Sequence, residues 1–476
     1  MSVAVATGHH IGGRRVDGQE CFTDISPVDG SVLAEVARGG PAEVDLAVRA
    51  AAEAFPAWAE LGPEGRAPYL HRLADLIDGD VDRLAEVECL DAGILLRSLR
   101  ARGIARGARN YRMYADLAVA YEERDWHSNG TWNRVQRMPA GPTAVITPWN
   151  APFMLATWKT APALAAGCTV VLKPAEWSPL SASLLADLTA EAGFPPGVFN
   201  VVQGVGEEAG AALVAHPGLR RVAFTGSSET GRSIGAASAA NLVPFTAELG
   251  GNGALVVFAD ADLDEAVRYA ALQYDDAGQT CLACTRLLVH RDVADPFLER
   301  FHHAVDEHVL GDPRLDTTTV APLIHAAHAA RVEGFVARAA ASGDEIVRGG
   351  RSELGELFFE PTLVLPRSNA SEIVQREVFG PVLTFQTFAD EAEAIALANS
   401  TPYGLSASVH TSSLARAERV GRPLRAGTVW VNAYLVRDLT APFGGMGESG
   451  IGREGGNYAL DFYSDLKALQ IKDGTT

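Results

Sequence analysis

The chain has 476 residues, 47% of them hydrophobic, which suits two or three domains whose cores need no disulfides. Forty basic residues against fifty-nine acidic ones give a formal net charge of −19. This balance argues against nucleic acid or an anionic membrane as a partner. It leaves an acidic small substrate open, because a few buried arginines can reverse the sign of the charge locally.

The beginning of the chain, MSVAVATGHHIGGRR, lacks the charged region and the apolar run of a signal peptide. No stretch of the sequence approaches the length of a membrane span. The cysteines are odd in number and scattered, so they predict no disulfide framework. We therefore expect a cytoplasmic protein with free thiols at Cys21, Cys89, Cys168, Cys281 and Cys284.

Cys281 and Cys284 form a C-x-x-C pair in the stretch DDAGQTCLACTR. No second pair and no clustered histidines complete a zinc site, so we expect no metal. A thioredoxin-type redox pair is a further interpretation of the spacing. A nucleophilic thiol needs a base or a positive field beside it, and this stretch holds no histidine.

Helical periodicity dominates the chain from Pro41 to about residue 121. Pro41 suits a helix start, and Val44, Val48, Ala51 and Phe55 fall on one face. The following WHSNGTWNRVQRM carries an Asn-Gly turn between short runs, which predicts a β-hairpin. A hairpin that projects from a helical region often finds its partner on another subunit.

Four short apolar runs, TAVITP, TVVLKP, FNVVQG and RVAFTG, follow from residue 143 with helix-like stretches between them. This alternation predicts a doubly wound parallel sheet, whose ligands sit at the carboxyl ends of the strands. A second unit of the same kind begins near residue 250, with ALVVFA, TRLLVH, PVLTFQTF and GTVWVN. The predicted fold class is therefore α/β, with two doubly wound domains.

Polar residues follow several of these predicted strands. Thr225, Gly226 and Ser227 open a helix whose free N–H groups could hold a phosphate. Lys173 and Glu176 could hold the two hydroxyls of a ribose, although a surface Lys–Glu pair is a common alternative. The spacing in GVGEEAG is one residue too long for the usual dinucleotide fingerprint, and a plain helix cap is the favoured interpretation of it.

Two further side chains suit catalysis. Glu248 lies between apolar residues and two glycines near the junction of the predicted units, which suits a base. Asn150 carries an amide that could donate to an oxyanion, although an Asn before Ala-Pro is also an ordinary turn residue.

Together these elements resemble the aldehyde dehydrogenase superfamily over almost the whole chain. The motifs that carry the resemblance keep the order of that family: PWNAP, KPAEWSPL, VAFTGSSETGR, ELGG, GQTCLA, REVFGPV, YGLSASV, GTVWVN and PFGG. The resemblance implies a cofactor domain (1–119 and 139–249), a catalytic domain (250–457) and a β element for bridging and oligomerisation (120–138 and 458–476). It also implies a homodimer or homotetramer.

The resemblance assigns the catalytic roles. Cys281, two places after the glutamine of G-Q-x-C, is the nucleophile, and Cys284 is a bystander. Asn150 stabilises the oxyanion of the thiohemiacetal, which passes hydride to the nicotinamide and leaves a thioester. Glu248 then activates the water that hydrolyses the thioester. The cofactor is NAD, with NADP possible, and its implied contacts are Lys173, Glu176, Gly206, Thr225, Gly226, Ser227, Leu249, Glu377 and Phe379.

Several stretches are closest to the branch that oxidises muconate-type semialdehydes, such as 5-carboxymethyl-2-hydroxymuconate semialdehyde. Arg106, nine residues before Ala115, matches an arginine of that branch, and Arg437 and Trp158 are further substrate-binding candidates. Two guanidiniums could bind a substrate carboxylate through paired hydrogen bonds. A solvated arginine on an arginine-rich helix is the alternative for Arg106.

The sequence departs from the family pattern at several positions. Asn252 and Gly447 replace usual lysines, and Asp275 and Asp276 lie where an asparagine is common. Two acids near the thiol are expected to raise its pKa and disfavour an anionic substrate. The alternatives are therefore a neutral aromatic or aliphatic aldehyde, acyl transfer to coenzyme A, and a non-catalytic NAD-binding or structural protein.

Overall fold

The first α/β unit is built on an eight-stranded sheet with the order β19-β11-β10-β7-β8-β9-β1-β2. The computed structural model of the protein describes residues 5–474. The five central strands run parallel, and all four predicted apolar runs are among them. The central strands are β7 (Thr143–Ile146), β8 (Val170–Lys173), β9 (Phe199–Val201), β10 (Arg221–Thr225) and β11 (Phe245–Glu248).

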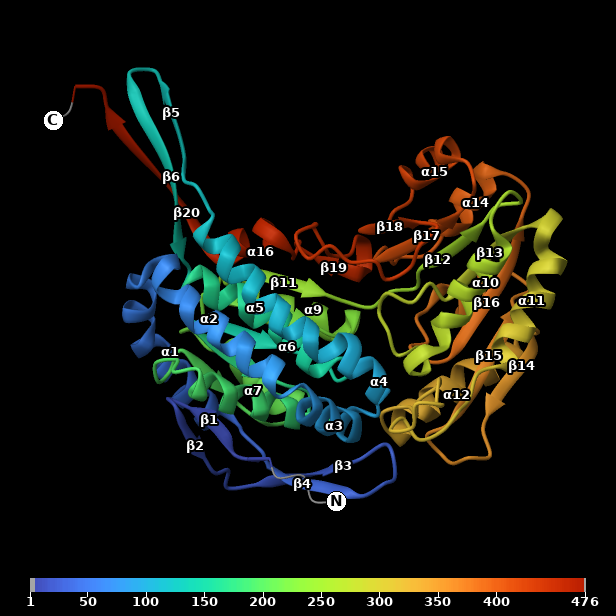
Figure 1. The fold of residues 1–476 in the computed structure, drawn as a ribbon, viewed down its shortest axis with the longest axis horizontal. Helices are drawn as coiled ribbons and strands as arrows, with labels where there is room; N and C mark the ends of the chain where they lie inside the picture. The colour runs from blue at the N-terminus through green and yellow to red at the C-terminus, as the bar shows by residue number, and fades with distance from the viewer. Residues whose placement is uncertain (1–4, 475–476) are drawn as a thin grey trace.

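Helices cover both faces of this sheet (Figure 1). On one face, Ala144 and Ile146 of β7 pack in a core with α1 (Pro41–Glu60) and α8 (Ala211–Ala215). On the other face, Val145 joins a core that five further helices share. These are α2 (Gly62–Gly79), α3 (Val81–Ala92), α5 (Ile104–Val119), α6 (Pro152–Ala166) and α7 (Leu180–Glu191). A strand buried on both faces must be apolar throughout, which is why these runs could be recognised in the sequence.

The first long helix begins at Pro41, as predicted, and Gly40 is its N-cap. Val44, Val48 and Ala51 are buried on one face. Phe55 is only half-buried, and Trp58 completes the buried face in its place. The indole of Trp58 donates to the carbonyl of Leu164 at 3.2 Å, which fixes the helix on α6.

The second α/β unit has a seven-stranded sheet with the order β14-β15-β16-β13-β12-β17-β18, in which only the edge strand β14 is antiparallel. The strands are β12 (Ala254–Val257), β13 (Arg286–His290), β14 (Glu345–Arg351), β15 (Phe359–Leu365), β16 (Val382–Phe388), β17 (Ser406–His410) and β18 (Thr428–Val431). Helices α10 (Leu263–Ala271), α11 (Ala294–Asp306) and α12 (Ala326–Ala341) share one core. The doubly wound α/β class is confirmed.

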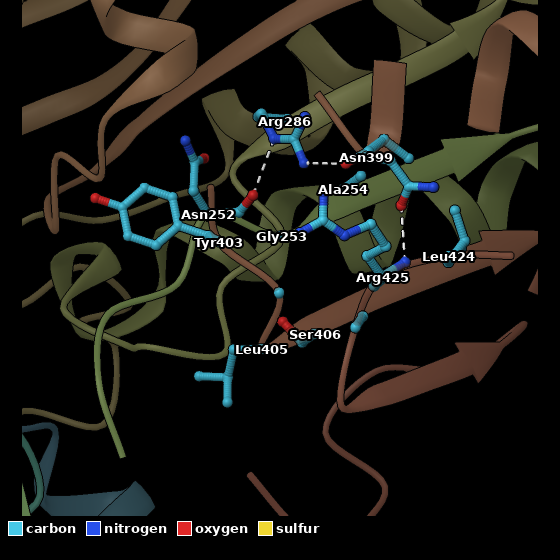
Figure 2. A pocket seen from close by; sticks show the side chains of 14 residues that line it. Asn252, Gly253, Ala254, Arg286, Asn399, Tyr403, Leu405, Ser406, Leu424 and Arg425 are labelled. Carbon is cyan, nitrogen blue, oxygen red and sulfur yellow. Dashed lines mark hydrogen bonds between the residues drawn. The ribbon is translucent and has the colours of Figure 1, made fainter. Parts of the chain in front are cut away.

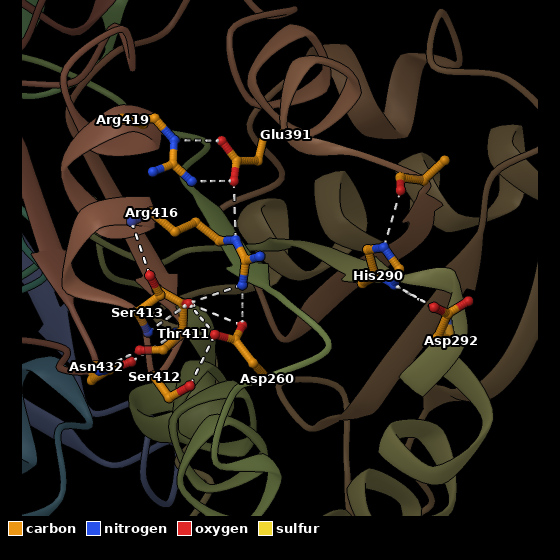
Figure 3. A network of polar contacts seen from close by, with 11 residues as sticks. Asp260, His290, Asp292, Glu391, Thr411, Ser412, Ser413, Arg416, Arg419 and Asn432 are labelled. Atoms are coloured by element: carbon orange, nitrogen blue, oxygen red, sulfur yellow. Dashed lines mark hydrogen bonds and ion pairs between the residues drawn. The ribbon is translucent and has the colours of Figure 1, made fainter.

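A polar network ties the opposite face of this second sheet together (Figure 3). Arg416 of α15 (Leu414–Gly421) lies between Asp260, which follows β12, and Glu391 of α14 (Glu391–Ala398). Its guanidinium is 2.5 Å from Asp260 and 3.1 Å from Glu391. These groups are partly exposed, so the network fixes the positions of the two helices more than it adds to stability.

The predicted hairpin is confirmed as β5 (Arg124–Ser128) and β6 (Thr131–Pro139), joined by Asn129 and Gly130 with φ values of 53° and 67°. The C-terminal strand β20 (Ser464–Lys472) pairs along the whole of β6. This three-stranded sheet projects away from both α/β units (Figure 1). All five residues of β5 are exposed, so its free edge faces outward.

Several edge strands were not predicted. The strands β1 (His9–Ile11), β2 (Arg14–Val16) and β19 (Gly450–Ile451) add antiparallel edges to the first sheet, and β3 (Cys21–Ile25) pairs with β4 (Val32–Ala37). Strand β19 lies within 250–457, the stretch assigned to the catalytic domain, yet it pairs with β11 of the first sheet. No helix among residues 5–474 is long and apolar enough to cross a membrane.

Candidate functional site

Three predicted catalytic side chains come together where the two α/β units meet. Glu248 ends β11, and Cys281 lies on the loop before β13. The Asn150 amide donates to the carbonyl of Gln279 at 2.9 Å, which places it beside the cysteine loop. Gly251 permits the close approach of the two loops, because a Cβ there would lie 2.1 Å from the Cys281 carbonyl oxygen.

The two cysteines of the C-x-x-C pair have different surroundings. Cys281 is half-buried, whereas Cys284 is fully buried in the core of the second unit. The backbone N–H of Cys284 donates to the side chain of Gln273 at 2.7 Å. Burial raises the pKa of each thiol to about 12. Of the two, only Cys281 is accessible to a substrate, so Cys284 is a packing residue in this structure.

Asp275 and Asp276 were expected to raise the pKa of Cys281, but other groups are the main cause of its raised pKa. After burial, the carboxylates of Glu377 and Glu248 are the largest causes of the raised pKa of Cys281. Asp276 accepts a hydrogen bond from the N–H of Leu95 at 3.3 Å. Burial, followed by Asp276, raises the pKa of Asp275 to about 7, so its negative charge at neutral pH is partial.

Glu248 is buried, and neither of its carboxylate oxygens has a hydrogen-bond partner among the described residues. Burial and the nearby Glu454 raise its pKa well above the ordinary value. Glu454 itself forms a 2.5 Å ion pair with Lys159, whose side chain is fully buried. A carboxylate with a raised pKa is a stronger base than an ordinary one, which suits activation of water.

The predicted cofactor residues form two groups, of which the first lies at the carboxyl ends of the first sheet. Lys173 at the end of β8 lies 3.4 Å from Glu176, and a Cβ on Gly206 would lie 3.9 Å from the Glu176 carboxylate. Ser227 caps α9 (Ser228–Ala240) by accepting from the N–H of Thr230. The buried hydroxyl of Thr225 has no partner among residues 5–474.

These residues fit a dinucleotide. The start of α9 offers N–H groups to a phosphate, and Glu176 offers a carboxylate to ribose hydroxyls. Gly226 lies tight against Phe224, since a Cβ there would lie 2.4 Å from the ring. Leu249 packs in the same way against Gly231 of α9.

Glu377 and Phe379 form the second group, on the opposite side, in the second unit. The Glu377 carboxylate accepts from the N–H of Gly251 at 2.7 Å, and burial raises its pKa to about 7. Phe379 has a φ of 60°, and its ring centroid lies 5.4 Å from that of Trp149. Both residues are therefore close to the cysteine loop.

The three predicted substrate residues form one cluster. Arg106 and Arg437 each lie 5.2 Å from the ring of the buried Trp158, and Arg437 also lies 3.9 Å from the ring of Phe443. The Nε atoms of both arginines are buried without a hydrogen-bond partner among the described residues. Burial and Arg437 lower the pKa of Arg106 to about 10. Arg106 is therefore not the fully solvated arginine of the alternative interpretation.

The replacement of a usual lysine by Asn252 is compatible with an ordered loop. Asn252 donates to the carbonyl of Val374 at 2.8 Å and accepts from the hydroxyl of Thr285. Its own carbonyl accepts from Arg286 at 2.9 Å. Figure 2 shows Asn252 and Arg286 around a pocket that Arg425 also lines. Sequence reasoning missed this packing, because the hydrogen bonds of the Arg286 guanidinium go to backbone carbonyls.

Sequence reasoning also missed the buried pair of Lys159 and Glu454. Lys159 directly follows Trp158 on an otherwise apolar helix. This isolated lysine was the one feature of the sequence that could have indicated a buried charge. Its partner lies 295 residues away in the chain, which no local pattern reveals.

A model of the aldehyde dehydrogenase family matches residues 15–469. The chain belongs to this family. Its members oxidise aldehydes with a nicotinamide cofactor, so the chain is an NAD(P)-dependent oxidoreductase. The predicted resemblance is confirmed.

Several relatives are named as semialdehyde dehydrogenases. The chain is 41% identical over 465 residues to the 2-hydroxymuconic semialdehyde dehydrogenase of Pseudomonas sp. (strain CF600), covering 95% of this chain and 96% of the relative. It is 38% identical over 461 residues to the 5-carboxymethyl-2-hydroxymuconate semialdehyde dehydrogenase of Escherichia coli, covering 95% and 98%.

Solved structures confirm the fold. HpcC from Thermus thermophilus has a TM-score of 0.96 and 44% identity, covering 99% of this chain and 94% of its own. The indole-3-acetaldehyde dehydrogenase AldA of P. syringae, solved as a cysteine-to-alanine mutant in complex with NAD+ and IAA, has a TM-score of 0.96 and 38% identity, covering 98% and 97%. NAD is thus a cofactor found in a solved aldehyde dehydrogenase of the same fold.

The thiol environments predict a selective alkylation. Iodoacetamide is expected to modify Cys281 and the exposed Cys21 but not the buried Cys284. The rate at Cys281 should rise about tenfold per pH unit from about pH 7 to about pH 10, because a thiol with so high a pKa is mostly protonated there. In Glu377→Gln, one negative charge is removed, the pKa of Cys281 falls, and its alkylation becomes several-fold faster.

Mass spectrometry of the peptides measures the rate at each cysteine. Cys21 is the internal control, and its rate should be the same in both proteins. Modification of Cys284 before Cys281 would contradict the assignment of the accessible thiol.

Proposed function

We propose that the chain oxidises an acidic, muconate-type semialdehyde to the corresponding carboxylate, with NAD as the oxidant. The observation that carries the substrate class is the pair of arginines at Trp158, both with a buried Nε and no hydrogen-bond partner for it among the described residues. The names of the two semialdehyde relatives support the same class.

Cys281 is the proposed nucleophile. Its thiolate adds to the aldehyde carbon and forms a thiohemiacetal oxyanion. The Asn150 amide has two hydrogens, one of which donates to Gln279, and we assign the second to the oxyanion. Loss of one such donor typically raises the barrier by about 3–4 kcal/mol.

The proposed cofactor contacts divide between the units. Lys173 and Glu176 hold the adenosine ribose, and the start of α9 at Ser227 holds the pyrophosphate. Glu377 and Phe379 position the nicotinamide end. NAD, when bound, accepts the hydride that leaves the substrate carbon. Glu176 favours NAD over NADP, because its carboxylate would repel a 2′-phosphate.

Glu248 is the proposed base of the second stage, in which water hydrolyses the thioester on Cys281. Its raised pKa means that it is protonated in the free enzyme over a wider pH range than an ordinary carboxyl. Turnover limited by hydrolysis should therefore increase with pH through that raised pKa, since only the carboxylate accepts a proton from water.

Glu248→Gln separates the two stages. Because the amide cannot accept the proton, the variant should release about one NADH per active site in a rapid burst, after which steady turnover falls about 100-fold or more. Stopped-flow absorbance of NADH measures both phases, and intact-protein mass spectrometry detects the acyl group on Cys281.

Cys281→Ala is the control for this experiment and should show neither the burst nor the acyl group. Unchanged steady turnover in Glu248→Gln would contradict the assigned base. Stimulation of the wild type by coenzyme A would indicate acyl transfer in place of hydrolysis.

Arg106→Met tests the substrate class. Loss of charge-assisted hydrogen bonds to a carboxylate should lower kcat/KM for an aldehyde with a distal carboxylate roughly 10- to 150-fold. The same change should leave kcat/KM for a neutral aldehyde of similar length within about twofold. NADH absorbance with the matched pair of aldehydes is the measurement.

Arg109→Met is the matched control, because Arg109 is an exposed arginine on the same helix. It should behave as the wild type with both aldehydes. Preference of the wild type for the neutral aldehyde would overturn the acidic substrate and keep the mechanism. NAD binding without turnover of any aldehyde would indicate a non-catalytic protein.

The three-stranded sheet of β5, β6 and β20 is the proposed contact between subunits of a homodimer or homotetramer. Trp126, Leu466 and Leu469 are exposed on it, and the edge of β5 is free. Deletion of residues 464–476 should therefore reduce the mass measured by sedimentation velocity to that of a monomer. The five free cysteines fit a reducing compartment such as the cytoplasm.

A further inference from the structure

Trp177 and His325 form a stacked pair that joins the two α/β units. Their ring centroids are 4.0 Å apart, with 29° between the ring planes. Trp177 lies between β8 and α7 of the first unit, and His325 directly precedes α12 of the second. Figure 1 shows α12 on the side of the second unit that faces the first. Trp177 is 46% exposed, and no step of the chemistry above uses it.

The pair lies beside one end of the proposed cofactor site. Trp177 directly follows Glu176, the proposed ribose ligand, and the charge of Glu176 also acts on His325. From His325 the ring contacts continue to His328 at 6.1 Å and from there to Trp149 at 5.3 Å.

The same chain of rings reaches the other end of the cofactor site. Trp149 lies 5.4 Å from Phe379, and the His328 imidazole is 2.8 Å from the carbonyl oxygen of Phe379. Rings from both units therefore connect the proposed ribose ligand with the proposed nicotinamide ligand, and the Trp177–His325 stack ends this chain of rings beside the ribose ligand.

Local hydrogen bonds hold the His325 ring and the backbone of Trp177 in place before any cofactor binds. The Nδ1 atom of His325 accepts from the N–H of His328 at 3.1 Å and so caps α12. On the other side, a turn in which the N–H of Ser178 donates to Ala175 fixes the backbone at Trp177. The stack therefore forms between two fixed segments, which reduces the entropy lost on contact.

We propose that the Trp177–His325 stack is a clasp that holds the two units together over bound NAD and slows the release of NADH. The inference rests on the proposed cofactor site. Nucleotide release requires the enclosing elements to separate, and separation here must break the stack. The contribution of an aromatic pair predicts that its loss speeds release by about 3- to 10-fold.

Three variants isolate the stack. Trp177→Ala removes one ring, and Trp177→Phe keeps a ring in its place. His325→Asn removes the other ring but keeps a side-chain acceptor for the start of α12. The double variant Trp177→Ala/His325→Asn tests whether the two rings act as a pair.

The measurement is the dissociation rate of NADH, followed by stopped-flow fluorescence when excess NAD displaces it. We expect Trp177→Ala and His325→Asn each to be about 3- to 10-fold faster than wild type, the double variant to match the single variants, and Trp177→Phe to stay within about twofold of wild type. In the Glu248→Gln background, the rate of the NADH burst at saturating NAD should be unchanged by all of these substitutions, which a general structural defect would not allow.

Unchanged release in Trp177→Ala would overturn the clasp. Faster release in Trp177→Ala with His325→Asn like wild type would also overturn it, because Trp177 would then contact the nucleotide directly. Multiplying effects in the double variant would show that the rings act independently, which would also contradict a paired clasp. Failure of wild-type protein to bind NADH at all would refute the cofactor site itself, which separates the two proposals.

Discussion

The buried ion pair between Lys159 and Glu454 is the contact on which the rest of the site depends. Lys159 is fully buried, and the pair joins α6 to the glycine-rich segment before the C-terminal strand. Glu454 also exchanges two backbone hydrogen bonds with Phe443, the residue on which Arg437 lies. Removal of either charge would leave the other buried and unpaired, which typically costs about 3–5 kcal/mol. The pair thus helps to position Arg437, a proposed substrate ligand, and places a charge beside Glu248.

Desolvation favours the protonated form of the two groups that are proposed to react, Cys281 and Glu248. Burial raises the pKa of both Glu248 and Cys281, and the charges that favour ionisation of Glu248, those of Lys159 and two arginines, do not offset it. Each stage of the proposed reaction therefore needs the deprotonated form of a group whose environment favours the protonated one. Desolvation makes the thiolate of Cys281 and the carboxylate of Glu248 more reactive once they form. A permanent partner that stabilised either anion would lower its reactivity.

The parts of the molecule that follow a local rule were predictable from the sequence. Strands β7, β8, β9 and β10 are buried on both faces and are followed closely by glycine or proline, and Ser227 caps its helix as serine often does. The edge strands β1, β2 and β19 have two or three residues each, too few for a period to show. The roles proposed for Cys281 and Arg106 came from resemblance to the family and not from a local rule. The pair of Lys159 and Glu454 was not found, because tertiary packing alone brings the two residues together. Asp275 and Asp276 are near Cys281 in the sequence, yet they are not the main cause of its raised pKa.

The two arginines at Trp158 sit in a protein whose net charge is −19. At long range such a protein repels an anion, and at short range these guanidiniums attract it. At physiological ionic strength the Debye length is about 8 Å, so the repulsion from distant surface carboxylates is largely screened while a contact with a half-buried guanidinium is screened much less. Added salt weakens the long-range repulsion between the enzyme and an anionic aldehyde. Capture of such a substrate therefore becomes faster, not slower, as moderate salt is added.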